Sequence, residues 1–310
     1  MKNNVIKENK SLKDISIKKQ REKADTSNCN EPTSYEELKS LISSFADKGK
    51  LDTLRFDDCY TSFMKNEWLL DKPINHYGQV SLDYPANSLP AYKEAVKGGF
   101  PILISVQMLD DGTCVCFKDK TLGKLTKEDG YIANCTLENI KKLKLEKTDL
   151  SIPTLGEALD VIQGKTPIIL EIFNESAVGK MEESILKIIN QYISKYNAWD
   201  SIAILSINPY TLEWFYENAP HFTRIIKSCL FTSLSKYADI KTKILKKLKL
   251  TNKIAHADFI AYNAQDLPCK YIEKYKPYGV LAYNVTSQEL YEKVLPHIDN
   301  VIFSGFVPKI

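Results

Sequence analysis

Three side chains with the right chemistry for an active site stand at or near the ends of short apolar segments: His76, Lys118 and Glu171. A histidine suits proton transfer because its pKa lies near neutrality. A lysine, with a reference pKa of about 10.4, stays protonated at neutral pH and is a poor base unless burial lowers that pKa. The three residues are therefore candidates for an acid–base site or for a buried charge pair.

The segments that must position these residues alternate in a regular way from residue 73 onward. Short runs rich in β-branched residues predict strands at 73–77, 101–107, 167–173, 201–207, 223–231, 258–262, 279–283 and 300–304. Helical patterns lie between them near 88–97, 154–163, 179–196, 209–218, 235–249, 267–275 and 286–294. Strands that alternate with helices imply a parallel sheet, and eight of them in about 240 residues predict a (β/α)8 barrel.

An open, doubly wound sheet is the main competing fold, but the sequence has no glycine-rich phosphate-binding turn of that class. In a (β/α)8 barrel the chemistry sits at the carboxyl ends of the strands. The strand-end residues to inspect are His76, Ser105, Lys118, Glu171, Ser206, Tyr262, Tyr283 and Ser304.

Local signals add detail to this plan. The turn Asp110-Asp111-Gly112 and the return segment 114–117 predict a hairpin after the second strand. Pro153-Thr154-Leu155 and Asn208-Pro209 predict helix starts, because proline is favoured in the first turn.

The chain opens with a charged segment that differs from the rest. Residues 1–23 hold eight Lys or Arg residues against three acidic ones, whereas the whole chain has a net charge of +3. We expect residues 1–33 to be a disordered basic tail. Residues 34–70 are predicted as a helical extension with a helix near 34–47, and residues 71–310 as the barrel.

Composition excludes several classes of protein. The 44% hydrophobic and 26% charged residues are typical of a globular protein, and the body of the chain lacks the positive charge of a nucleic-acid binder. No apolar run reaches the ~18–20 residues of a membrane helix, and no signal peptide is evident. The seven cysteines show no zinc spacing. We expect a cytoplasmic protein with reduced thiols.

Several motifs, in order and spacing, resemble those of the glycerophosphodiester phosphodiesterases. Pro73-Ile74-Asn75-His76-Tyr77-Gly78 is similar to the opening P-I-A-H-R-G of that family, and Pro85-Ala86-Asn87-Ser88-Leu89 to its P-E-N-S/T-L. Further similarities cover residues 98–119, 152–155, 169–173, 206–209, 258–262, 283–285 and 302–305. The resemblance spans about residues 67–308 and implies a TIM barrel of the phospholipase C-like phosphodiesterase type.

The resemblance also implies a site: a divalent cation held by three carboxylates, two histidines as acid and base, and Arg and Lys on the phosphate. His76, Asp119 and Glu171 match family positions, and Asn87 lies in a matching motif. The other positions depart from the pattern. They are Tyr77 for the arginine, Ala86 for a glutamate, Leu103 and Ser105 for the metal pair, Lys118 for the second histidine, Phe173 for the lysine and Tyr283 for a tryptophan.

These replacements predict a site without a metal, because Mg²⁺ or Ca²⁺ needs about six or more oxygen ligands and Glu171 alone supplies few of them. We expect Lys118 to occupy the space of the lost cation and to form an internal ion pair with Glu171. Mg²⁺ or Ca²⁺ would act only if the site were rebuilt.

Three functions remain open. The first is a pseudoenzyme or strongly impaired hydrolase that keeps the barrel to bind a phosphodiester, a lipid head group or a protein partner. The second is an active phosphoric diester hydrolase of lipid metabolism with a site rebuilt around His76, Lys118 and Glu171. The third is a structural or membrane-surface module that uses the basic tail and the Lys-rich helix 235–249.

Overall fold

The computed structural model describes residues 67–309 apart from residues 82 and 146 and the segments 175–176, 230–253 and 274–278. The predicted basic tail 1–33, the predicted helix near 34–47 and the predicted Lys-rich helix 235–249 lie outside the described residues.

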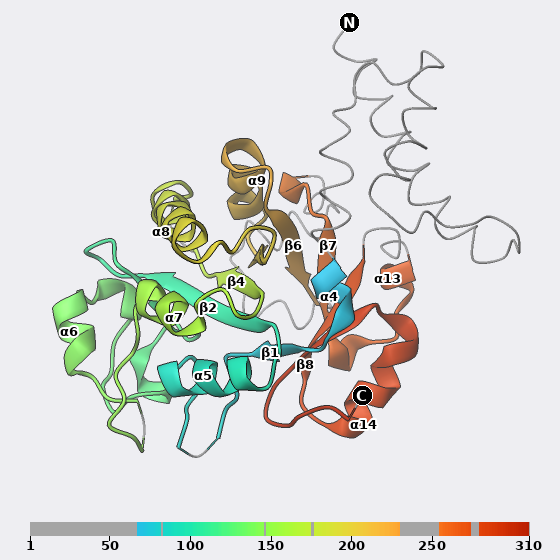
Figure 1. Ribbon diagram of the computed structural model, residues 1–310, viewed down its shortest axis with the longest axis horizontal. Coiled ribbons are helices and arrows are strands. Elements are labelled where there is room, and N and C mark those ends of the chain that lie inside the picture. Colours follow the sequence, from blue (N-terminus) through green and yellow to red (C-terminus); the bar gives the residue numbers. More distant parts are fainter. Residues whose placement is uncertain are drawn as a thin grey trace, which may run out of the picture. The chain divides into compact units, whose positions relative to one another are not determined.

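Eight parallel strands form a closed barrel (Figure 1). They are β1 (Ile74–His76), β2 (Ile102–Met108), β4 (Ile168–Ile172), β5 (Ile202–Ser206), β6 (Thr223–Ser228), β7 (Phe259–Asn263), β8 (Val280–Val285) and β9 (Asn300–Phe303). The strands follow the order β1-β9-β8-β7-β6-β5-β4-β2, and the pairing of Asn75 with Ile102 joins β1 to β2 and closes the ring. The predicted (β/α)8 barrel is therefore confirmed.

A ninth strand, β3 (Cys114–Cys116), runs antiparallel to the end of β2, with Val106 opposite Cys116. The turn between the two strands contains Gly112 at φ +85°, a left-handed conformation that glycine adopts at little cost. The predicted hairpin is confirmed.

Helices cover the outside of the barrel wall (Figure 1). They are α5 (Leu89–Lys97), α7 (Leu155–Ile162), α8 (Lys180–Tyr196), α9 (Pro209–Asn218), α13 (Lys270–Glu273) and α14 (Gln288–Val294). Two start where the sequence predicts. Thr154 and Glu157 form a capping box at the start of α7, and the Asn208 side chain accepts from the amide of Tyr210 ahead of α9. In the described part of the chain, no helix combines the length and apolarity needed to cross a membrane.

One apolar cluster fills most of the barrel interior. Its residues are Leu69, Ile74, Leu103, Ile169, Ala203, Leu205, Ile225, Phe259, Ala261, Leu281, Tyr283 and Ile302. Leu69 belongs to α4 (Glu67–Asp71), the short helix that precedes β1. The Asn300 side-chain amide donates to the carbonyls of Leu69 and Lys72, both at 2.7 Å, and ties α4 to the first residue of β9. The amino end of the barrel is thus closed by apolar packing.

A separate small core supports the segment between β3 and α7. This segment includes the 3-10 turns Leu122–Lys124 and Ile132–Asn134 and the helix α6 (Leu137–Lys142). Its buried residues are Leu109, Val115, Phe117, Leu122, Ile132, Ile140, Leu145 and Ile152. Lys118 and Asp119 leave β3 at the edge of this core.

Candidate functional site

The carboxyl end of the barrel interior holds polar side chains where the amino end holds apolar ones. Side chains alternate along a strand, so a residue two positions after an interior residue also faces the interior. Glu171 follows Ile169 in this way, and Lys227 follows Ile225. The same relation places the following residues at this end of the barrel: His76, Ser105, Glu171, Lys227 and Tyr283.

Glu171 is the centre of this group and is 1% exposed. One carboxylate oxygen, Oε1, accepts from the Lys227 ammonium in a buried ion pair. The other, Oε2, accepts from the Ser105 hydroxyl at 3.1 Å and lies 3.6 Å from His76 Nε2. Burial alone would raise the pKa of Glu171, but Lys227 and His76 lower it to about 2. The carboxylate is therefore ionised, and both of its oxygens are in use.

His76 is covered by its neighbours and is only 2% exposed. The ring of Tyr77 stacks on it, with centroids 3.4 Å apart and planes 24° apart. Burial lowers the pKa of His76 to about 4, although Glu171 offsets part of this shift. The imidazole is therefore neutral at neutral pH, and its Nε2 atom lacks a hydrogen-bond partner among the described residues.

Lys227 lies between its carboxylate partner and two aromatic rings. Its ammonium is 4.6 Å from the centroid of Tyr283 and 5.9 Å from that of Phe173, within the range of cation–π attraction. Burial is the main cause that raises the pKa of the Tyr283 hydroxyl well above its usual value, so this hydroxyl stays protonated. The two rings and Glu171 together hold the ammonium at the barrel mouth.

Lys118 does not take the place that the sequence suggested. Its ammonium lies over the ring of Tyr77, 5.0 Å from the centroid, and Lys227 is the cation that pairs with Glu171. The expected Lys118–Glu171 ion pair is wrong, because Lys118 follows the hairpin strand β3 and not a strand of the barrel wall. The neighbouring Asp119 has Oδ1 3.4 Å from the ammonium of Lys124.

The loop after β1 is held in a strained form that places Tyr77 over His76. Tyr77 has φ +70°, which is rare for a bulky residue. Its amide donates to the Leu103 carbonyl at 2.9 Å, and its carbonyl accepts from the Asn87 amide at 2.9 Å. Gly78 follows at φ +83°, and a Cβ atom there would lie 2.6 Å from the backbone of Ala91. Only glycine fits this turn.

Asn87 links the same loop to β2. Its side-chain Oδ1 accepts from the Tyr92 hydroxyl at 2.8 Å and from the Ser105 amide at 3.3 Å. Asn87 therefore fixes the backbone of Ser105, whose hydroxyl in turn binds Glu171. Its role in the structure is to position neighbouring groups.

The residues at the mouth do not fit a divalent cation. Glu171 is the one carboxylate in this group, and Lys227 already neutralises its charge. The two positions where the resemblance implies the other carboxylates carry Leu103, which lies in the apolar core, and Ser105, which donates to Glu171. Within the described ranges, no group of three or more His, Cys, Asp or Glu residues could hold a metal ion. A cation such as Mg²⁺ would find too few free oxygen ligands.

Lys227 is the site residue that the sequence reasoning missed. It lies inside the predicted strand 223–231, in the run Thr-Arg-Ile-Ile-Lys-Ser. A lysine two positions after an interior isoleucine was a usable signal, since a charged residue on the inner face of a barrel strand needs a partner. The sequence pattern alone does not say which carboxylate that partner is.

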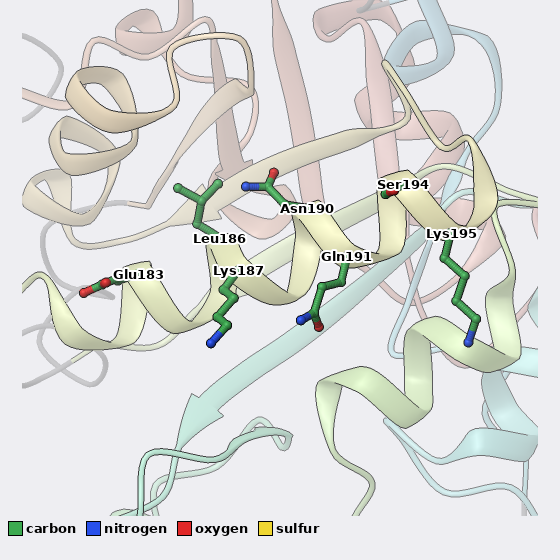
Figure 2. A pocket seen from close by; sticks show the side chains of 7 residues that line it. All are labelled: Glu183, Leu186, Lys187, Asn190, Gln191, Ser194 and Lys195. Carbon is green, nitrogen blue, oxygen red and sulfur yellow. The ribbon is translucent and has the colours of Figure 1, made fainter.

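A hollow of about 720 Å³ lies elsewhere, along the outer face of α8 (Figure 2). Its lining residues are Glu183, Leu186, Lys187, Asn190, Gln191, Ser194 and Lys195. All of them come from one helix, and Figure 2 shows Lys195 extending toward α7, where its ammonium lies 2.8 Å from Asp160. This hollow lacks the converging polar groups from several elements that mark the barrel mouth.

Comparison with known proteins finds similarity to glycerophosphodiester phosphodiesterases. The sequence model of the glycerophosphoryl diester phosphodiesterase family matches residues 80–275. The chain is 33% identical over 158 residues to a glycerophosphodiester phosphodiesterase of Caldanaerobacter subterraneus subsp. tengcongensis. The matched residues make up 48% of this chain and 63% of that protein. It is 28% identical over 134 residues to glycerophosphodiester phosphodiesterase 1 of Homo sapiens, which covers 40% of each protein. The chain thus matches less than two thirds of the length of these relatives.

Solved structures share the fold along most of the barrel. A phosphodiesterase from Oleispira antarctica, in complex with the product sn-glycerol-3-phosphate, has a TM-score of 0.59 at 22% identity and covers 76% of this chain and 93% of its own. A glycerophosphodiester phosphodiesterase from Thermotoga maritima has a TM-score of 0.56 at 20% identity and covers 74% and 92%. Since the family match spans more than half of the sequence and the barrel agrees with it, the chain belongs to the glycerophosphoryl diester phosphodiesterase family.

Proposed function

We propose that this chain is a family member that binds a phosphate-bearing ligand at the barrel mouth and does not hydrolyse it. One observation carries the proposal: Glu171, the family metal ligand that remains, is buried and ion-paired inside the protein. A carboxylate in this state has no free charge to offer a catalytic cation.

The chemistry of the family needs more than the mouth provides. Cleavage of a phosphodiester requires neutralisation of charge on the phosphate oxygens and transfer of protons. His76 is neutral and could accept a proton, but Lys118 stands where the resemblance implies the second histidine. The loss of a single group that stabilises a transition state typically reduces the rate by about 10²–10³. Loss of the metal and of the second histidine together supports the absence of useful turnover.

The charges at the mouth favour a phosphate-bearing ligand. The half-buried Lys118 has its ammonium over Tyr77, and Lys227 places a second ammonium near the same histidine. Lysine ammonium groups form strong charge-assisted hydrogen bonds with phosphate oxygens. The structure from Oleispira antarctica holds sn-glycerol-3-phosphate, which supports glycerol phosphate as the chemical class. A free glycerophosphodiester and a lipid head group share this chemistry.

The first test is an assay of the full chain with glycerophosphodiesters in the presence of Mg²⁺, Ca²⁺ or Mn²⁺. The relative from Caldanaerobacter subterraneus serves as a positive control for the assay. We expect this chain to give no turnover above that of its His76→Ala variant. Metal-stimulated turnover that His76→Ala abolishes would show an active hydrolase with a rebuilt site and would overturn the proposal.

The second test is binding. Calorimetric titration of sn-glycerol-3-phosphate in the presence of EDTA should show binding without a metal, weaker in Lys118→Met. Glycerophosphocholine and vesicles that contain anionic lipid distinguish a soluble phosphodiester from a lipid head group. Absence of binding to all three probes would contradict the proposal.

A further inference from the structure

We infer that Lys227 is an internal cation that substitutes for the divalent ion of the family and keeps such ions out of the barrel mouth. This inference deepens the proposed function and relies on it for the role of the mouth in ligand binding, although the ion pair stands without it. Lys227 is a positioning residue here, since its effect on the site passes through Glu171.

Lys227 brings its positive charge to the end of the barrel where the family implies a divalent cation. A divalent cation in this family would be held by carboxylates at the carboxyl ends of the strands that carry Leu103, Ser105 and Glu171. The structure instead brings a positive group to Glu171 from β6, past the apolar Leu205 of the intervening strand β5. A buried carboxylate needs a compensating charge, and the ammonium of Lys227 supplies it permanently.

The Lys227 side chain fits this place in the barrel. The ammonium lies between the rings of Tyr283 and Phe173, and its side chain is only 17% exposed. Phe173 stands where the resemblance implies the family lysine, two residues after Glu171. The charge that the resemblance implies just after β4 is therefore absent, and the ammonium of Lys227 on β6 lies 5.9 Å from the centroid of the Phe173 ring.

Both carboxylate oxygens of Glu171 already have partners within the protein. Ser105 donates to Glu171 Oε2 and the Lys227 ammonium binds Oε1, so a metal that bound both oxygens would have to displace both partners. Removal of Lys227 would leave Glu171 as a buried anion with Ser105 and His76 beside it. Such a cavity attracts a cation, so the site excludes metal because Lys227 is present.

The test uses three variants of the full chain. Lys227→Met keeps the unbranched stem and removes the charge. Lys118→Met is the matched control, because its ammonium lies over Tyr77 and not on Glu171. The Glu171→Gln/Lys227→Met double variant removes both members of the pair. Thermal unfolding of each is measured in EDTA and in Mg²⁺, Ca²⁺ or Mn²⁺.

We expect the Tm of the unmodified chain and that of Lys118→Met to be the same in EDTA and in each divalent cation. Lys227→Met should lose about 10 °C in EDTA, because breaking a buried ion pair leaves an uncompensated charge, and should regain part of this loss in a divalent cation. The double variant should have a Tm close to that of the unmodified chain, and its Tm should be the same with and without metal.

A metal-dependent Tm in the unmodified chain would overturn the inference, as would a Lys227→Met variant as stable as Lys118→Met. If Lys227→Met does not fold, the double variant decides: recovery of folding supports a charge effect, and failure to fold contradicts it. None of these measurements uses a phosphate ligand or turnover. A chain that binds no phosphate therefore refutes the proposed function without deciding the role of Lys227.

Discussion

Strand β6 carries two cations, three residues apart, that are bound in opposite ways. Arg224 is bound at each of its three nitrogens: its guanidinium donates to the carbonyls of His256, Pro220 and Phe222 and lies 2.8 Å from Asp258. Lys227 has one hydrogen-bond partner among the described residues, Glu171, and otherwise faces aromatic rings. Arg224 fastens the loops at the amino end, whereas Lys227 holds a charge at the mouth.

The two cations differ in how many of their donors are bound within the protein. A guanidinium with five donors can bind several backbone carbonyls at once and gains nothing from a ligand. An ammonium with three donors and one carboxylate partner keeps donors for another anion. The same contrast holds between the ends of the barrel, since apolar Leu69 and Phe259 fill the amino end and polar groups line the carboxyl end.

The largest expected effect is at Arg224. Arg224→Met should reduce the free energy of unfolding by about 3–5 kcal/mol, because it removes the charged partner of Asp258 and leaves three carbonyls without their side-chain donor. Urea unfolding measures this loss. Binding of sn-glycerol-3-phosphate by the folded fraction should be unchanged. Weaker binding at equal folded fraction would show that Arg224 also contributes to ligand binding.

The next effect is a loss of stability in acid. The pKa of His76 is lowered in the folded state, so below pH 6.5 the unfolded chain gains a proton that the folded chain does not take up until about pH 4. Stability is therefore complete above pH 6.5 and falls by about 3 kcal/mol as the pH drops to 4. The lowered pKa of Glu171 extends the decline from about pH 4.5 toward pH 2.

Urea unfolding at several pH values in this range checks the slope. His76→Gln should flatten the decline between pH 6.5 and 4 whatever its effect on absolute stability. An unchanged slope in His76→Gln would mean that another group titrates there.

A smaller effect is expected at Ser105. Ser105→Ala removes a hydrogen bond to a buried carboxylate and should reduce the free energy of unfolding by about 2 kcal/mol. Ser201→Ala is the control, since this half-buried hydroxyl donates to the neutral carbonyl of Ala198 at 2.8 Å. Equal losses in the two variants would argue against a charged Glu171.

The smallest change in free energy concerns ligand binding by Lys118. Lys118→Met should weaken the binding of sn-glycerol-3-phosphate about tenfold, the equivalent of about 1.4 kcal/mol, and leave the Tm unchanged. Lys124→Met is the control, because this exposed lysine lies 3.4 Å from Asp119 and away from Tyr77. Equal binding by both variants would place the ligand away from the mouth.

The sequence predicted most of the barrel because strands and helices leave local signals. The β-branched runs marked all eight strands, and Thr154 and Asn208 marked helix starts through their caps. His76 ends β1 and Glu171 is the last but one residue of β4, as predicted, whereas Ser105 lies in the middle of β2 and Tyr283 precedes the last two residues of β8.

The partner of Glu171 could not be predicted in the same way. Glu171 on β4 and Lys227 on β6 are separated by β5, and their pairing depends on the reach of a lysine across the interior. The position of Lys118 in a family motif predicted it as the partner of Glu171, but the hairpin directs its ammonium to Tyr77. Local patterns fix the face of a strand on which a side chain lies, but do not fix which charges meet across a barrel.

Calorimetric titration of Mg²⁺, Ca²⁺ and Mn²⁺ into the unmodified chain tests whether an internal ammonium holds the place of the metal. The occupied oxygens of Glu171 predict no saturable binding tighter than about millimolar. Saturable binding of any of the three cations below millimolar concentration, lost in Glu171→Gln, would show that Glu171 binds a metal and that Lys227 does not take its place.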